Sequence, residues 1–231
     1  KEESKNIFVD SLPDVMPFGL RFLPFQESNQ KKIVSHIKSV LKKNNLIPDL
    51  LWFYLVDYPG ITNAFIDSIV VYDCVDDHSA YGGLRKPEFV NSLEKEIVEN
   101  SEVVFTTTEE LSNKLEKFGG VPLVVPNGVD YPLFEKWNGI KPEILKNEKR
   151  KIIGYFGALQ KWFDIEFIRK AAKEHSDKLF VLAGPCSEEF KNEFSEFDNF
   201  LFPGKIKYNE AFLHFINCTT YNLICFGTNS S

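Results

Sequence analysis

The sequence predicts an α/β protein made of two doubly wound domains, each a parallel sheet flanked by helices. Three observations predict it. Short apolar runs of strand length alternate with stretches of helical periodicity along most of the 231 residues. The apolar runs are continuous, as expected of parallel strands that are covered on both faces. A charged stretch that lacks buried-strand character, residues 136–150, interrupts the alternation and is typical of a linker.

The amino-acid composition limits the classes of function that the chain can have. With 43% hydrophobic and 14% aromatic residues the chain can bury a substantial core, and a net charge of −6 argues against nucleic acid as a general partner. The four cysteines fall at no metal-binding or C-x-x-C spacing and indicate free thiols in a reducing cytosol. No signal peptide is visible and no apolar run approaches the ~20 residues of a membrane-spanning helix, so we expect a cytoplasmic protein.

The first domain, residues 1–135, is expected to begin with extended segments and loops, because prolines are scattered over its first thirty or so residues. A helix is predicted from Asn29, with Ser28 or Asn29 as its cap and Asn44–Asn45 as its end. The next elements are expected in alternation: strands Leu50–Val56 and Ser68–Cys74, a helix from Pro87, strand Glu102–Thr106, a helix capped by Thr108 and stopped at Gly119–Gly120, and strand Pro122–Val125.

The second domain, residues 151–231, repeats the alternation after the linker. We expect strand Ile152–Phe156, a helix from Asp164 to about His175, strand Leu179–Gly184, a helix capped by Ser187 with Phe190 and Phe194 inward, a short strand before Pro203, a helix from Asn209 and strand Asn222–Phe226. Two such blocks predict two Rossmann-like domains with a cleft between them. Since the chain starts at Lys1 without a methionine and stops just after a strand-like run, both domains are expected to be truncated at their outer ends.

Polar residues follow the predicted strand Ser68–Cys74, in the segment "VDDHSAYGG". Doubly wound sheets bind ligands at the carboxyl ends of their strands. Two carboxylates beside an imidazole, Asp76, Asp77 and His78, can bind hydroxyls, exchange a proton or hold a metal. We favour a catalytic role without metal, since no second ligand cluster appears at a defined spacing. The alternative is a loop in which Asp77 or Ser79 bonds to backbone and His78 is merely exposed.

Glycines follow the strands of the second domain. In "GYFGALQKWFD", Gly157 lets backbone come close to a ligand, and the start of the next helix favours negative charge. Asp164 is expected to cap that helix. We predict that a nucleoside diphosphate is held by five residues: Gly157, Lys161, Gly184, Gly204 and Lys205. The alternative is that Gly154 and Gly157 simply ease packing between strand and helix.

Several fragments resemble one family. "SEVVFTTTEELSNKLEKFG", "VVPNGVDYPLF", "IGYFGALQKWFDIEFI" and "LFVLAGP" are similar to retaining GT-B glycosyltransferases of group 1 or family 4. "VYDCVDDHSAY" and "GYFGALQKWFD" resemble members that build bacterial surface polysaccharides. The resemblance covers most of the chain from about Leu50 onward. It implies a hexosyltransferase-type enzyme that moves a sugar from a nucleoside diphosphate to an acceptor hydroxyl, with retention and without a bound metal.

The resemblance also assigns roles. The donor would bind the second domain, where Gly157 resembles the glycine under the diphosphate and Lys161 falls near the lysine that neutralises it. The family's Lys-Gly pair is replaced or displaced here, since Trp162 and Phe163 stand in its place. Asp76, Asp77 and His78 would face the acceptor, a saccharide or glycoconjugate through which the protein could associate peripherally with the inner face of the membrane. The family's paired-glutamate segment is expected beyond Ser231, so this chain by itself could be inactive.

Two other functions are consistent with these residues. A nucleotide-sugar epimerase can share the architecture and would return an isomerised free donor. A non-catalytic member would bind a nucleotide sugar or a partner protein, and the imperfect lysine match together with the missing glutamates favours it.

Overall fold

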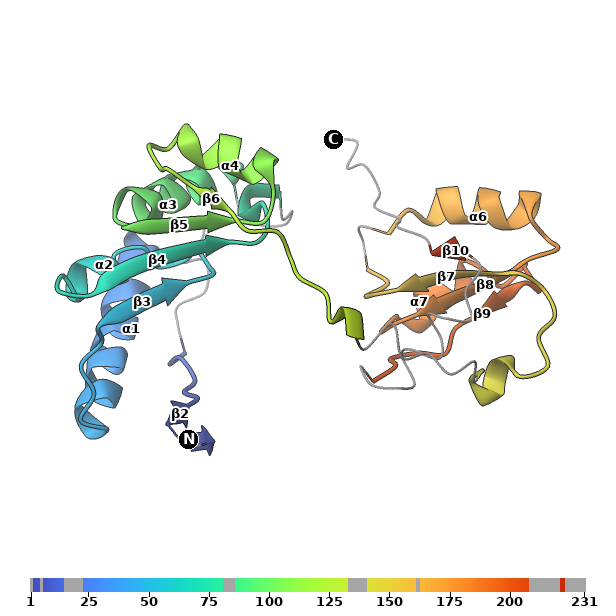
Figure 1. Ribbon diagram of the computed structural model, residues 1–231, viewed down its shortest axis with the longest axis horizontal. Helices are drawn as coiled ribbons and strands as arrows, with labels where there is room; N and C mark the ends of the chain where they lie inside the picture. The colour runs from blue at the N-terminus through green and yellow to red at the C-terminus, as the bar shows by residue number, and fades with distance from the viewer. Residues whose placement is uncertain are drawn as a thin grey trace. The chain divides into compact units, whose positions relative to one another are not determined.

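A computed structural model describes residues 2–4, 6–14, 23–80, 86–132, 141–160, 163–207 and 221–222. The chain divides into two compact units, Lys1–Gly128 and Val129–Ser231 (Figure 1). The division falls between Gly128 and Val129. Part of the predicted linker is packed: Leu145, in the 3-10 turn η2 (Glu143–Leu145), is buried beside Ile152 of the second unit.

The first unit is built on a four-stranded parallel sheet, with strand order β3-β4-β5-β6. The strands are β3 (Leu50–Phe53), β4 (Ile69–Cys74), β5 (Val103–Thr106) and β6 (Leu123–Val124). The helices are α1 (Leu23–Lys43), α2 (Ile61–Ala64), α3 (Pro87–Glu99) and α4 (Glu109–Glu116), with a 3-10 turn η1 (His78–Ala80) after β4. A short antiparallel pair, β1 (Glu2–Ser4) and β2 (Ile7–Phe8), precedes them. The predicted parallel α/β fold is confirmed.

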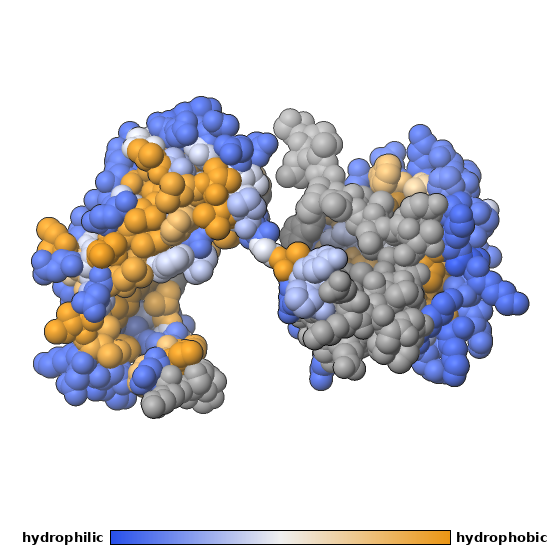
Figure 2. All heavy atoms as spheres, viewed as in Figure 1, coloured by the Kyte–Doolittle hydropathy of each residue, from blue (hydrophilic) through white to orange (hydrophobic). Residues whose placement is uncertain are grey.

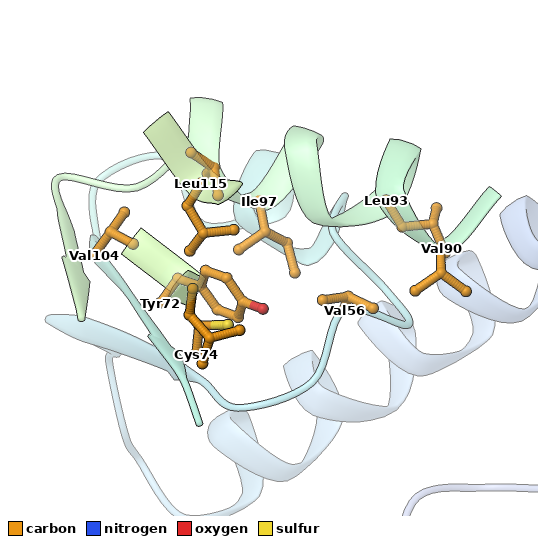
Figure 3. Packing of buried hydrophobic residues seen from close by; sticks show 10 residues of the cluster. Val56, Tyr72, Cys74, Val90, Leu93, Ile97, Val104 and Leu115 are labelled. Carbon is orange, nitrogen blue, oxygen red and sulfur yellow. The ribbon is translucent and has the colours of Figure 1, made fainter. Parts of the chain in front are cut away.

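Two helices cover one face of this sheet. Because alternate residues of a strand point to opposite faces, Tyr72 and Cys74 of β4 turn to the same side as Val104 of β5. They pack there against α3 and α4 (Figure 3), whose contributions are Val90, Leu93, Ile97, Val98, Leu111 and Leu115.

The opposite face of the same sheet exposes apolar side chains. Figure 2 shows hydrophobic atoms gathered over the strands of the first unit. Trp52 stacks on Phe105 with ring centroids 5.9 Å apart, and its indole N–H donates to the Asp73 carboxylate at 3.3 Å. The large hydrophobic residues exposed on these strands or just past them include Leu50, Trp52, Tyr54, Ile69, Leu123 and Val125.

The second unit has its own parallel sheet, with strand order β10-β7-β8-β9. The strands are β7 (Ile152–Phe156), β8 (Leu179–Ala183), β9 (Phe200–Leu201) and β10 (Tyr221–Asn222), and the helices are α6 (Ile165–Glu174) and α7 (Glu188–Asn192). Every residue of β8 is buried. Its alternate residues supply two clusters: Phe180 and Leu182 pack with α6 and α7, while Leu179 and Val181 pack with Leu145 and Ile152. Cover on both faces explains the continuous apolar run.

The predicted helix caps are confirmed. The side chains of Thr108, Asp164 and Ser187 accept hydrogen bonds from the backbone N–H groups three residues later, at 3.3, 2.9 and 3.2 Å. Each cap satisfies one of the N–H groups that a helix start leaves without an intrahelical partner. Phe190 and Phe194 are buried as predicted, and Pro87 is the first residue of α3.

The start of α1 was predicted wrongly. The helix begins at Leu23 rather than Asn29, so neither Ser28 nor Asn29 caps it. Pro24 is compatible with this position, because the N–H that proline lacks would have no partner in the first helical turn. Tertiary hydrogen bonds anchor these turns: Gln26 donates to the Asp57 carbonyl at 3.2 Å, and Gln30 accepts from the Gly60 N–H at 3.0 Å. The helix predicted from Asn209 lies outside the described residues.

Candidate functional site

The acidic-histidine cluster follows β4 directly, as predicted. Asp76 and Asp77 are exposed, and His78 starts the turn η1, which packs against α3. The imidazole of His78 is only 4% exposed. The alternative of a merely exposed histidine is therefore wrong for this structure.

Asp77 already has three hydrogen-bond donors. Its Oδ1 accepts from the Ser79 N–H at 3.0 Å, from the Ser79 hydroxyl at 2.6 Å and from the Lys114 ammonium at 2.7 Å. Burial by itself would raise the pKa of Asp77, but the hydrogen bonds from Lys114 and Ser79 outweigh it and hold the pKa below its ordinary value. Asp77 is therefore a stable carboxylate that organises the turn, which matches the local bonding that the sequence left as an alternative.

Lys114 leads from Asp77 to a buried carboxylate. The same ammonium lies 2.7 Å from Oε2 of Glu94, a residue of α3 with 0% exposure. Oε1 of Glu94 accepts from the Tyr72 hydroxyl at 2.7 Å, and the Cys74 thiol lies 3.7 Å from the same oxygen. These residues join β4, α3 and α4 by polar contacts inside an otherwise apolar cluster.

Burial affects the pKa of each of these groups, but it decides the direction of the shift only for Tyr72 and Cys74. It raises the pKa of the Cys74 thiol to about 12 and carries the pKa of the Tyr72 hydroxyl far above its ordinary value. Burial would lower the pKa of Lys114, but its hydrogen bonds to Asp77 and Glu94 outweigh that effect and raise the pKa. Cys74 and Tyr72 are therefore neutral at physiological pH, and Lys114 is charged.

Sequence reasoning missed Glu94 and Lys114, although a signal was present. Val90, Leu93 and Ile97 form an apolar stripe of α3, and Glu94 stands on that same stripe, four residues after Val90. A carboxylate in an apolar stripe predicts a buried partner of opposite charge. The partner could not be identified, because the pairing depends on how α4 packs beside α3.

The predicted donor site lies at the carboxyl ends of β7, β8 and β9, which are parallel neighbours. Gly157 follows β7 and Gly184 follows β8. The Gly157 N–H donates to the Ala183 carbonyl at 3.0 Å, and a Cβ added at Gly184 would lie 1.7 Å from the Gly157 carbonyl oxygen. The structure thus brings these two residues together, as the donor-site prediction requires.

Packing also explains both glycines. A Cβ at Gly157 would lie 2.8 Å from the Tyr155 hydroxyl, which in turn donates to the Ala158 carbonyl at 3.2 Å. The two strand ends therefore approach too closely for side chains, whether or not a ligand binds. The alternative interpretation, in which glycine eases packing, is supported by these contacts and does not exclude the first.

The remaining donor-site residues are less constrained. Gly204 follows β9 with φ +75, and a Cβ there would meet nothing within 4 Å. Its backbone favours glycine on conformational grounds. Lys205, the next residue, is exposed. Lys161 lies outside the described residues. Phe163 is buried against Tyr155 and Phe190, and Asp164 caps α6.

The described parts of the chain hold neither a metal-binding cluster nor a membrane-spanning helix. No three histidine, cysteine or acidic side chains there gather closely enough to hold a metal ion. None of the described helices combines the length and hydropathy needed to cross a bilayer. A cavity of about 470 Å³ lies between α1 and α2, beside Lys31, Lys38 and Gly60, and includes none of the predicted site residues.

Comparison with known proteins shows the fold. No family model matches the chain, and no curated protein matches it in sequence. Among solved structures, sucrose-phosphate synthase from Thermosynechococcus elongatus has a TM-score of 0.67 at 16% identity, covering 84% of this chain and 54% of that one. HepE from Anabaena in complex with UDP has a TM-score of 0.62 at 15% identity, covering 82% and 55%.

A putative UDP-N-acetylglucosamine 2-epimerase from Listeria monocytogenes is also similar, with a TM-score of 0.54 at 10% identity, covering 85% of this chain and 56% of that one. The chain thus spans just over half the length of the structures it matches. The glycosyltransferases among them have the GT-B fold. Two parallel α/β units at this level of similarity give the present chain the same fold.

Proposed function

We propose that this chain is part of a glycosyltransferase that moves a sugar from a nucleoside-diphosphate donor to an acceptor hydroxyl. The observation that carries the proposal is the close approach of Gly157 and Gly184 at the ends of β7 and β8. Both glycines stand at adjoining carboxyl ends of a parallel sheet, which is the edge where ligands of doubly wound sheets bind. The GT-B fold supports the same conclusion, since HepE was crystallised with UDP and with UDP-glucose.

The diphosphate would be held by backbone and by cations. The first turn of α6 leaves N–H groups without intrahelical partners, and its dipole favours negative charge. Lys205, after β9, would add a positive charge, and Lys161 is proposed as a second. Charge that develops on the leaving diphosphate would be stabilised by these groups. We propose a hexosyl donor and transfer with retention, on the sequence resemblance.

The acceptor would be activated at the end of β4. We propose that His78 positions or deprotonates the acceptor hydroxyl, together with Asp76 or Asp77. The contacts of Asp77 with Lys114 and Ser79 favour Asp76 as the acidic partner, because a carboxylate with three donors is a weak base. A saccharide or glycoconjugate of cell-surface polysaccharide synthesis is proposed as the acceptor, again on the resemblance, with peripheral membrane association through it.

Binding of the donor can be tested on the full-length protein. A thermal-shift panel of UDP, ADP, GDP and their sugars should give at least one ligand that raises the melting temperature, because a ligand bound to the folded state alone stabilises it by mass action. Lys205→Ala should weaken that ligand about fivefold, as expected for one screened charge contact. Lys173→Ala, in the last turn of α6, is the matched control and should bind normally. A panel without any stabilising nucleoside diphosphate would contradict the proposal.

An epimerase is the second candidate. Its support is the epimerase among the similar structures and the shared architecture. Product analysis separates the two, since a transferase places the donor sugar on an acceptor, whereas an epimerase returns an isomerised free nucleotide sugar. A non-catalytic member would bind the donor and give neither product.

A further inference from the structure

The core of the first unit contains a buried ion pair among apolar side chains. Glu94 is fully buried, and its partner Lys114 is 19% exposed. A buried ion pair generally stabilises a protein no better than well-packed apolar residues of similar volume, because removing two charges from water offsets their attraction. The side-chain positions around Glu94 are filled by valine, leucine and isoleucine, which could have continued there. The presence of the Glu94–Lys114 pair therefore needs an explanation other than its contribution to stability.

The bonding continues outward from Glu94. The Tyr72 hydroxyl fixes one carboxylate oxygen and Lys114 the other, each at 2.7 Å. The same Lys114 ammonium bonds Asp77 Oδ1 at 2.7 Å and lies 3.4 Å from the Ser79 hydroxyl. Lys114 therefore connects a carboxylate held within the core to a loop carboxylate at the surface.

Asp77 in turn shapes the loop. Its side chain binds the N–H and hydroxyl of Ser79, and its carbonyl accepts from the Ala80 N–H at 3.0 Å. These bonds close the turn that carries His78. The link from Glu94 to the turn passes through the charged groups of Lys114 and Asp77, so its geometry is more specific than that of apolar contacts alone.

We propose that Glu94 and Lys114 are positioning residues, which hold Asp77 and thereby fix the orientation of the His78 turn at the carboxyl end of β4. Neither residue touches the acceptor in this proposal. Lys114 acts on the turn and Glu94 acts through Lys114. The catalytic consequence rests on the proposed function, whereas the ordering of the turn does not.

The ordering can be measured by amide hydrogen exchange on the full-length protein. In Lys114→Met the Ser79 and Ala80 amides should exchange about tenfold faster, because Asp77 loses its charge-assisted bond and the turn opens more often. Lys95→Met is the matched control: Lys95 pairs with Glu99 on the exposed side of α3 at 3.6 Å. It should leave both amides unchanged, and Lys114→Arg should restore most of the protection.

Two variants allow for misfolding. If Lys114→Met does not fold, Asp77→Ala leaves the buried pair intact and should loosen the same two amides, and Lys114→Met combined with Glu94→Gln removes the uncompensated buried charge. Folded variants whose Ser79 and Ala80 amides exchange at the parental rate would overturn the proposal.

Kinetics test the catalytic consequence. In the full-length protein, Lys114→Met should lower the rate of sugar transfer or raise the KM for the acceptor about tenfold or more, while UDP binds with parental affinity. Faster exchange at Ser79 with unchanged transfer would overturn the catalytic half. A parent protein that transfers no sugar would instead contradict the proposed function, and the exchange result would still decide the positioning role.

Discussion

Gly157 and Gly184 lie next to each other at the ends of β7 and β8. A side chain at Gly184 would clash with backbone atoms, whereas a side chain at Gly204 would have open space around it. The backbone carbonyl of Gly157 occupies the position that a Cβ at Gly184 would take, 1.7 Å away. Backbone cannot yield as a flexible side chain can, so β7 and β8 would have to separate. Gly204 presents the opposite case, since its surroundings are open and its positive φ is the constraint.

Gly184→Ala should therefore cost more stability than Gly204→Ala. We expect about 3 kcal/mol for Gly184→Ala, as for overpacking a core, and about 1 kcal/mol for Gly204→Ala, the strain of a left-handed residue. Hydrogen exchange of the β8 amides under native conditions measures both. Equal losses, or a larger loss at Gly204, would contradict the packing of the two strand ends.

The carboxylate of Asp77 should titrate below the ordinary value for aspartate. Since its pKa is lowered in the folded state, its contribution to stability is present above the unfolded pKa of about 3.9 and is lost as the pH falls through the folded pKa. A carboxyl NMR titration should give a midpoint below about 3.9, and Lys114→Met should move it upward. A midpoint that does not respond to this substitution would remove Lys114 as a cause.

At the scale of elements, the sequence predicted what depends on local chemistry. Strand positions followed from continuous apolar runs, and three helix starts followed from Thr108, Asp164 and Ser187, because a cap acts on its own helix. The beginning of α1 could not be predicted in this way. Its first turns are held by Gln26 and Gln30, whose partners lie some thirty residues later in the chain.

The same distinction between local chemistry and tertiary packing holds for the candidate site. The positions of Gly157 and Gly184 at strand ends could be predicted, because each glycine comes directly after an apolar run in the sequence. The burial of His78 and the Lys114 link could not be inferred, because both depend on how α3 and α4 pack beside β4.

Asp164 offers a test at the start of α6. Asp164→Asn keeps a capping oxygen and should leave stability nearly unchanged, whereas Asp164→Ala should cost about 1 kcal/mol. Asp164→Asn also removes a negative charge from the helix end where a diphosphate is proposed. UDP should therefore bind several-fold more tightly to Asp164→Asn than to the parent, as calorimetry can measure. Weaker binding by a normally stable Asp164→Asn would place the diphosphate away from α6.

At the scale of the molecule, the chain combines two parallel α/β units with just over half the length of the solved structures that it matches. In our account this chain contributes two features. The backbone at the ends of β7, β8 and β9 holds the diphosphate, and the ion pairs of Lys114 order the turn after β4.

The most direct test of the central claim is a hydrogen-exchange footprint of the full-length protein with and without a saturating nucleoside diphosphate, using UDP first. The account predicts slower exchange after β7 and β8, at residues 157–160 and 184–186, and after β9 at residues 204–206, with inorganic phosphate as the weaker control. Protection confined to the cavity between α1 and α2, or no protection by UDP, ADP or GDP, would contradict it.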